Sequence, residues 1–239
     1  MFTHYGARGF ILKACDKGEA DQSFTVFSEE FGKLVILAKA ARKMKSKLKG
    51  GLNLFSLSEI EFIQGKSKKT LTDAKPVKMF SNIRKDLGSL RAAFRISETL
   101  DSLTGREEPD RRIWILLEEC LETLDKKPAL KRNLVYYYFF WNLADFLGFK
   151  PALHYCALCQ EKIVSENLYF DSGSGGTICG KCFKGEGARA SRDAIKIIRI
   201  ILEKDLEKLS KLKLSEAHFI DLEKISEEFH SFLSEKREI

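Results

Sequence analysis

Four cysteines arranged as two close pairs constrain this chain more than any other feature of its sequence. Cys156 and Cys159 form one C-x2-C pair, Cys179 and Cys182 form the second, and 19 residues separate the pairs. Each pair places two thiols on one tight turn, and two such turns complete a tetrahedral four-sulfur site, the closed geometry of structural zinc. The spacing therefore predicts a Zn²⁺-stabilised module, a zinc finger, at about residues 152–187.

Other chemistry fits these cysteines less well. An iron–sulfur cluster stays open as an alternative, with less support from this spacing. Disulfides are disfavoured because residues 1–14 lack the apolar stretch and cleavage site of a signal peptide. A zinc deaminase needs an H-x-E motif, which His154 does not begin, and His154 itself is a less favoured ligand than the four thiols. Because a four-thiolate site has no open position for water or substrate, we expect no zinc catalysis.

The first third of the chain has the pattern of β-strands. Alternating or short apolar runs predict strands at residues 9–14, 23–28, 33–39, 52–64 and 70–80. Glu29 to Gly32 is typical of a hairpin turn in which Gly32 adopts a positive φ. The alternation in the fourth run changes phase between Leu54 and Phe55 and again before Ile60, as bulges in a curled sheet would produce. Five short strands within about 80 residues suit a small closed barrel.

From about Asn82 the apolar period becomes helical. Apolar spacing predicts helices at about residues 87–103, 110–124, 128–146, 195–209 and 219–233, with Pro128 opening the third. Residues 134–146 are apolar on nearly all sides and are expected to form a central buried helix. The sequence thus predicts an α+β chain with a barrel domain, residues 1–80, and a helical domain, residues 81–239, that carries the cysteine module.

The positive charge of the chain is confined to its N-terminal third. The net charge is +7, and residues 1–80 contain 15 Lys and Arg against 8 Asp and Glu, whereas the remainder contains 26 of each. This asymmetry favours a polyanion-binding N-terminal module, and a merely lysine-rich surface is the alternative. The longest apolar run, residues 134–141, is far shorter than the roughly 20 residues of a membrane span. We therefore expect a soluble cytoplasmic protein without membrane partners.

Two basic clusters lie between predicted strands, where they could line a groove for phosphates. A solvated linker or a short amphipathic helix is the alternative for the first cluster. Exposed phenylalanines would add stacking platforms, but the sequence does not distinguish exposed from buried ones. The candidate DNA-binding residues are Lys39, Arg42, Lys43, Lys45, Lys47 and Lys49 in the first cluster and Lys66, Lys68 and Lys69 in the second.

Several motifs in this order resemble the bacterial RecO family of DNA repair proteins. They are GFILK at residues 9–13, GEAD at 18–21, TVFSEEFG at 25–32, AARK at 40–43, and the cysteine pairs with Gly175-Gly176 before the second. The resemblance implies an N-terminal OB fold and a helical domain with a zinc finger. It also implies a nucleoid-associated recombination mediator that binds single- and double-stranded DNA and anneals complementary strands. With RecR, such proteins help load the recombinase onto DNA covered by single-strand-binding protein (SSB).

Two functions follow as hypotheses. The first is this DNA-binding mediator, with the basic barrel face neutralising phosphates. The second is a zinc-stabilised scaffold for protein contacts with only incidental DNA binding, in which one basic helix accepts the acidic tail of SSB. The candidate residues there are Arg189, Arg192, Lys196 and Arg199, with ordinary surface charge as the alternative. An enzyme is not expected, because the sequence has no nucleophile–base set, Walker loop or paired-carboxylate signature.

Overall fold

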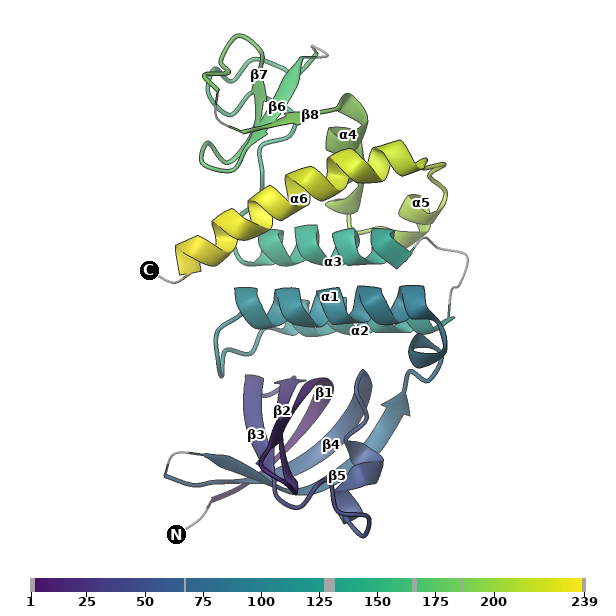
Figure 1. Ribbon diagram of the computed structural model, residues 1–239. Helices are drawn as coiled ribbons and strands as arrows, with labels where there is room; N and C mark the ends of the chain where they lie inside the picture. Colours follow the sequence, from purple (N-terminus) through teal and green to yellow (C-terminus); the bar gives the residue numbers. More distant parts are fainter. Residues whose placement is uncertain (1–2, 67, 127–131, 165–166, 186, 238–239) are drawn as a thin grey trace. The chain divides into compact units, whose positions relative to one another are not determined.

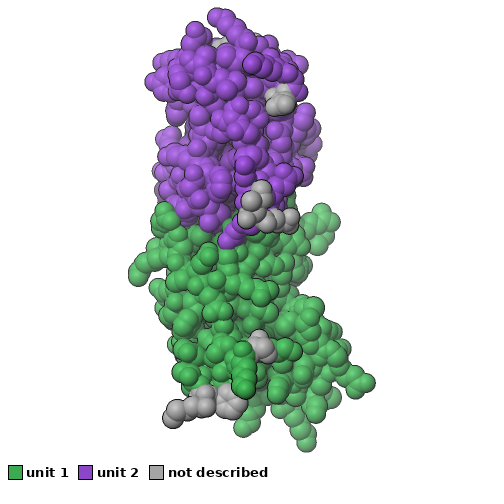
Figure 2. Space-filling model, turned by 90° about the vertical axis from the view of Figure 1, so that its left-hand side faces the viewer, with its two compact units in different colours: residues 1–133 green, residues 134–239 purple. Residues whose placement is uncertain are grey.

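The structure, a computed structural model, consists of two compact units, Met1–Asn133 and Leu134–Ile239 (Figures 1 and 2). It describes residues 3–237 except residues 67, 127–131, 165–166 and 186, and except the side chain of Lys49. Strands come first and helices follow, which confirms the α+β class. Within the described ranges, every helix is too short or too polar to cross a bilayer.

The first unit contains the five-stranded barrel that the sequence predicts. The strands are β1 (Thr3–Lys17), β2 (Asp21–Ser28), β3 (Gly32–Ala38), β4 (Ser56–Gln64) and β5 (Lys69–Met79). They close in the order β1-β2-β3-β5-β4, and the β3–β5 pairing is parallel whereas the other four are antiparallel. Alternate residues such as Leu34 and Ile36 enter the core, and Gly32 has the predicted positive φ of 64°. The closed five-stranded barrel confirms the OB fold.

The strand predicted at residues 52–64 is wrong at its beginning. A short 3-10 helix, η1 (Lys47–Gly51), precedes β4, and Phe55 has a positive φ of 59° that no regular strand accommodates. Leu52 and Leu54 are apolar because they pack against the barrel core, and this explains the first phase change without a bulge. Later in the strand, the β4–β5 register does shift, between Leu57 and Ser58 and again between Glu61 and Phe62.

Two helices complete the first unit, α1 (Leu87–Leu103) and α2 (Arg111–Lys126), preceded by the turn η2 (Ile83–Lys85). Asp86 caps α1 by accepting a hydrogen bond from the Ser89 backbone N–H. The ring of Phe10 in β1 packs 4.5 Å from that of Trp114 in α2. Both helices therefore group with the barrel in one compact unit. The division into a barrel domain, residues 1–80, and a helical domain, residues 81–239, remains a prediction.

The second unit is helical with a small sheet. Its helices are α3 (Arg132–Phe146, which begins in the first unit), α4 (Arg192–Ile201), α5 (Leu206–Ser210) and α6 (Glu216–Arg237), and its strands are β6 (Leu168–Asp171), β7 (Gly176–Cys179) and β8 (Ala188–Ala190). Every side chain from Leu134 to Ala144 is buried, which confirms the predicted central helix. Trp141 stacks on Phe229 of α6 at 5.2 Å and donates a hydrogen bond to Ser226.

One helix prediction in this unit is wrong. The segment expected as a single helix over residues 195–209 is interrupted between α4 and α5, because Lys204 adopts a positive φ of 60°. Asp205 then caps α5 by accepting from the Lys208 backbone N–H. The predicted start of the third helix at Pro128 lies outside the described residues.

Candidate nucleic-acid groove and metal centre

A groove of about 540 Å³ crosses the outer face of β2 and β3 in the first unit. β3 pairs with β5 at Ile36↔Lys69 and Leu37↔Thr70, whereas at Lys33 it bridges to Arg106 in the α1–α2 connection. The groove lies between these two contacts. Its charged lining residues are Lys17, Asp21, Lys33, Lys66, Lys68, Lys69, Arg106 and Glu107. Six cations against two carboxylates give the groove a net positive charge, which favours an anionic ligand.

The strand period explains how β3 supplies this groove. Leu34 and Ile36 point into the barrel core, so Lys33, Val35 and Leu37 face outward and line the groove. Val35 is 42% exposed, which is unusual for a large aliphatic side chain in a strand. The groove therefore has an apolar floor between charged walls.

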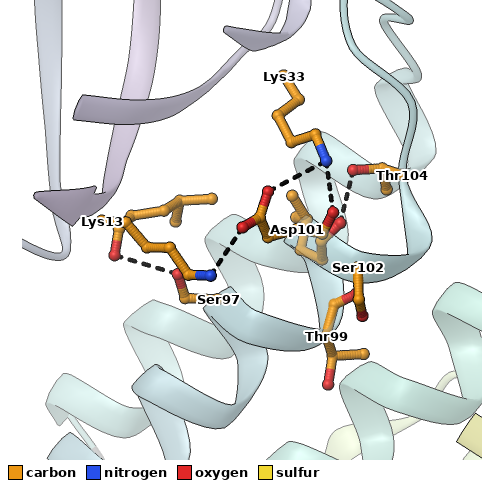
Figure 3. Close-up of polar contacts among 9 residues, drawn as sticks. Lys13, Lys33, Ser97, Thr99, Asp101, Ser102 and Thr104 are labelled. Carbon is orange, nitrogen blue, oxygen red and sulfur yellow. Dashed lines mark hydrogen bonds and ion pairs between the residues drawn. The ribbon is translucent and has the colours of Figure 1, made fainter. Parts of the chain in front are cut away.

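Lys33 has a structural partner in the first unit. Its side chain is only 8% exposed, and its ammonium lies 3.1 Å from a carboxylate oxygen of Asp101 and also donates to the Asp101 carbonyl (Figure 3). Lys13 binds the other carboxylate oxygen at 2.7 Å. Burial raises the pKa of Asp101, but the hydrogen bonds and charges of both lysines outweigh it and lower the pKa. Lys33 thus anchors the barrel to the end of α1. The exposed cations of the groove are Lys17, Lys66, Lys68 and Arg106.

The predicted DNA-binding residues separate into two places. Lys66, Lys68 and Lys69 line the groove, next to Lys17 and Arg106, which sequence reasoning missed. Alternation along β1 and β3 could have suggested Lys17 and Lys33 as outward-facing. Arg106 comes from the helical part of the chain, and no pattern in the sequence connects it to the barrel.

The first basic cluster forms an exposed loop next to the groove: the Ala40 N–H donates to the carboxylate of Asp21, which lines the groove, but none of the described cluster members is itself in the lining. Its members Lys39, Arg42, Lys43, Lys45 and Lys47 are exposed, and the side chain of Lys49 lies outside the described residues. Arg42 pairs with Asp16 at 3.2 Å and borders a smaller pocket of about 330 Å³. Leu48 packs against the barrel core, so this loop and η1 also cap the barrel.

The phenylalanines that the sequence left undecided are not exposed platforms. Phe24, Phe27 and Phe55 are buried, and half-buried Phe31 packs edge-on against Tyr5 at 5.7 Å. Among the described residues that line the groove, none is aromatic. The groove therefore offers charge and aliphatic surface without a ring on which bases could stack.

The four predicted metal ligands meet in the second unit. The sulfur atoms of Cys156, Cys159, Cys179 and Cys182 all lie within 4.8 Å of one another, and those of Cys159 and Cys179 are 3.9 Å apart. A tetrahedral ion with metal–sulfur bonds of about 2.3 Å requires sulfur–sulfur edges of about 3.8 Å. The thiols therefore fit a four-coordinate metal. His154 is not part of this cluster of described residues.

Backbone contacts hold the thiols in this arrangement. The Cys179 N–H donates to the Cys156 sulfur at 3.4 Å, and the Ala157 N–H donates to the Thr177 carbonyl at 2.8 Å, which joins the two turns. Burial raises the pKa of Cys156, but backbone N–H groups of Cys159, Cys179 and Leu158 outweigh it and lower the pKa to about 6. This lowered pKa favours the thiolate of Cys156, the form that binds metal.

The structure does not bring the four candidate partner-binding residues into one pocket. Arg189 and Arg192 line a pocket of about 750 Å³ together with Lys224, whereas Lys196 is exposed outside that lining. Arg199 donates to the Leu153 carbonyl from both Nε, at 2.9 Å, and Nη2. Burial lowers the pKa of Arg199, and the nearby charge of Arg192 lowers it further. Arg199 therefore ties α4 to the segment before the first cysteine pair.

Two family models cover nearly the whole chain. The model described as Recombination protein O N terminal matches residues 1–80, and Recombination protein O C terminal matches residues 84–238. The chain is 33% identical over 220 residues to the DNA repair protein RecO of Dehalococcoides mccartyi, covering 92% of this chain and 86% of that one. It is 29% identical to RecO of Alkaliphilus metalliredigens, over 92% and 90% of the two chains. The chain therefore belongs to the RecO family of DNA repair and recombination proteins.

Proposed function

We propose that the protein is a recombination mediator that binds single- and double-stranded DNA in the groove of the barrel and anneals complementary strands. The observation that carries this proposal is a set of exposed cations around one groove that have no paired carboxylate among the described residues: Lys17, Lys66, Lys68 and Arg106. Exposed like charges at close range repel each other and are relieved by an anionic partner. A phosphodiester backbone supplies that partner regardless of base sequence.

None of the described groove residues is aromatic, so the groove would bind the phosphates of a strand and not the faces of its bases. Proteins that bind single strands through stacking occupy the faces of the bases. A groove that binds phosphates leaves the bases free to pair with a second strand. Neutralising part of the charge on both strands also lowers their repulsion. Strand annealing then needs no bond-breaking step, and the protein acts as a mediator and not as an enzyme.

The four cysteines would hold Zn²⁺ in a structural role. Four thiolate ligands complete the coordination of the ion, so the bound metal supplies folding energy to the module and not a reactive position. Iron would fit the same sulfur donors. Metal analysis together with the visible absorption spectrum distinguishes the two, because Zn²⁺ bound to thiolates is colourless above 300 nm whereas iron–sulfur centres absorb strongly.

Contacts with RecR and with SSB-covered DNA in the cytoplasm complete the proposed role. The pocket lined by Arg189, Arg192 and Lys224, together with Asp193 and Asp221, has one more cation than carboxylates. This small positive excess supports binding of an acidic peptide, such as the SSB tail, and makes a protein-interaction scaffold the second candidate function. Calorimetry of the full chain with an isolated tail peptide tests this pocket. Heat that disappears in an Arg189→Ala/Lys224→Ala variant would support it, and no heat with the parent protein would reject it.

Fluorescence anisotropy with a labelled oligothymidine tests the groove. We expect Lys66→Ala/Lys68→Ala/Lys69→Ala to weaken single-strand binding by about 30-fold or more at low salt, because three phosphate contacts are lost. The parent protein should show a log–log salt slope of about −3 to −4. The matched control is Arg42→Ala/Lys43→Ala/Lys45→Ala, which removes the same charge from the loop that caps the barrel. A slope near zero, or equal losses in both triple variants, would contradict binding centred on the groove.

A further inference from the structure

We propose that the α1–α2 connection, residues 104–110, forms one side of the groove and takes part in DNA binding. Arg106 binds a backbone phosphate, and Glu107 competes with phosphate for Lys69. The inference rests on the proposed binding of DNA in the groove, and it extends that site beyond the barrel. Both side chains line the groove although they lie 27 and 28 residues after β5 ends at Met79. A barrel isolated at residue 80 would lack both.

Backbone contacts place this connection against β3. The Glu107 N–H donates to the Lys33 carbonyl at 3.0 Å, and Lys33 and Arg106 form a parallel bridge, so the connection extends the edge of the strand. Gly32 lets the two segments approach, because a Cβ there would lie 2.3 Å from the Glu108 carbonyl oxygen. Thr104 ends α1 by donating its hydroxyl to the Leu100 carbonyl at 2.6 Å. The position of Arg106 is therefore set by the fold.

The environment of Arg106 favours an external anion. Its neighbours in the lining include Lys66 and Lys68, and no described carboxylate pairs with its guanidinium. Two arginines elsewhere in the unit do have such partners: Arg112 binds Asp110 at 2.7 Å and Arg132 binds Asp86 at 2.9 Å. A planar guanidinium binds phosphate through two parallel hydrogen bonds, which suits an arginine placed at a groove wall.

Glu107 has the opposite role. Its carboxylate binds the ammonium of Lys69 at 2.6 Å, and its backbone adopts a positive φ of 59°, which residues other than glycine rarely do. The Lys69 side chain is 14% exposed, so its charge is already neutralised in the free protein. A DNA phosphate must displace the carboxylate to reach Lys69. A polyanion that contacts several cations at once can do so, whereas a single phosphate ion competes poorly.

The test uses the full chain and an oligothymidine in anisotropy titrations from 50 to 300 mM salt. Arg106→Ala should weaken binding about threefold to tenfold at the lowest salt and reduce the slope by about 0.7, the value for one lost phosphate contact. Arg106→Lys should retain the slope, because it keeps the charge. Glu107→Gln should tighten binding about twofold to fivefold, because Lys69 is released from a partly exposed ion pair. Arg91→Ala, an exposed arginine on α1 outside the groove lining, is the matched control and should bind as the parent does.

Each outcome separates this inference from the proposed function. If Arg106→Ala binds like Arg91→Ala while the Lys66/Lys68/Lys69 triple variant binds weakly, the connection is not part of the site and the groove still is. If the triple variant also binds normally, the groove itself is rejected. Weaker binding by Glu107→Gln with an unchanged melting temperature would overturn the competitive role of the carboxylate. Thermal melts of every variant show whether a loss of binding reflects unfolding.

Discussion

The groove and the cysteine cluster both gather like-charged groups, but they differ in where the compensating charge comes from. The exposed groove cations lie on β1, in the β4–β5 turn and in the α1–α2 connection, and a long polyanion would neutralise them together. The four thiols lie within 4.8 Å of one another, so a single ion held inside the cluster suffices. The first arrangement suits reversible, salt-sensitive binding. The second suits a structural metal that stays bound while the protein is folded. We therefore expect that loss of metal binding leaves DNA binding intact, and the reverse.

The largest effect is expected at the cysteines. Cys156→Ser should abolish metal binding and unfold the module around residues 152–190, since structural zinc supplies about 10–16 kcal/mol in isolated fingers. Metal content and hydrogen exchange of the full chain measure this. Single-strand binding should persist, because the groove is in the other unit. Cys15→Ser, at an exposed thiol of β1, is the control and should change neither. Parallel loss of metal and DNA binding in Cys156→Ser would contradict the independence of the two sites.

The next largest effect concerns the close approach that builds the groove wall. Gly32→Ala should destabilise the first unit by roughly 2–4 kcal/mol, because φ is +64° and the new Cβ would overlap the Glu108 carbonyl. Denaturant unfolding followed through Trp114 measures the change in the free energy of unfolding. The control is Gly18→Ala, which has a similar φ of +68° but no atoms within 4 Å of the new Cβ, so it carries only the conformational cost. Equal losses in both variants would show that the contact with Glu108 is unimportant.

A smaller effect is expected at the ion pairs that anchor the barrel to α1. Asp101→Asn should lower the free energy of unfolding at pH 7 by about 1–3 kcal/mol, because mostly buried Lys33 loses its counter-charge while Asp101 itself is partly exposed. The folded-state pKa of Asp101 is lowered, so its contribution is present above the unfolded pKa of about 3.9 and is lost as pH falls through the folded pKa. Urea titrations from pH 7 to pH 3 should therefore show less acid sensitivity in the variant. Glu98→Gln, at an exposed position on α1, should keep the parent's pH profile.

Much of this architecture follows from local pattern. The period-2 runs predicted three of the five strands closely, because the barrel interior requires alternate apolar residues such as Leu34 and Ile36. The run at residues 9–14 located β1 but not its full length, Thr3–Lys17. The all-round apolar segment predicted the buried α3 for the same reason. The cysteine spacing predicted the metal ligands, since sulfur chemistry and short turns are both local. Each success depends on residues that are close in sequence.

The failures come from contacts between distant residues. Leu52 and Leu54 are apolar because they pack against the barrel core. In the sequence alone, their spacing looks like the alternation of a strand. Lys204 interrupts the predicted helix because its φ is positive. A lysine is common in helices, so the sequence does not indicate this break. Arg106 lines the groove because Gly32 allows the α1–α2 connection to pack beside β3. This contact joins residues more than 70 positions apart in the sequence. Such sites require the fold before the chemistry can be recognised.

The smallest effect separates structural from surface arginines next to the cysteine module. Arg199 donates to the Leu153 carbonyl, three residues before Cys156, whereas Lys196 on the same helix is exposed. Arg199→Ala should cost the second unit about 1–2 kcal/mol, because a buried carbonyl loses a charged donor, and should speed metal loss to a chelator. Lys196→Ala should leave both quantities unchanged. The opposite pattern, in which Arg199→Ala weakens binding of an acidic peptide but leaves unfolding and metal release as in the parent, would return Arg199 to the partner-binding surface. The comparison between the two variants thus decides whether positive charge on α4 supports the metal site or recognises a partner.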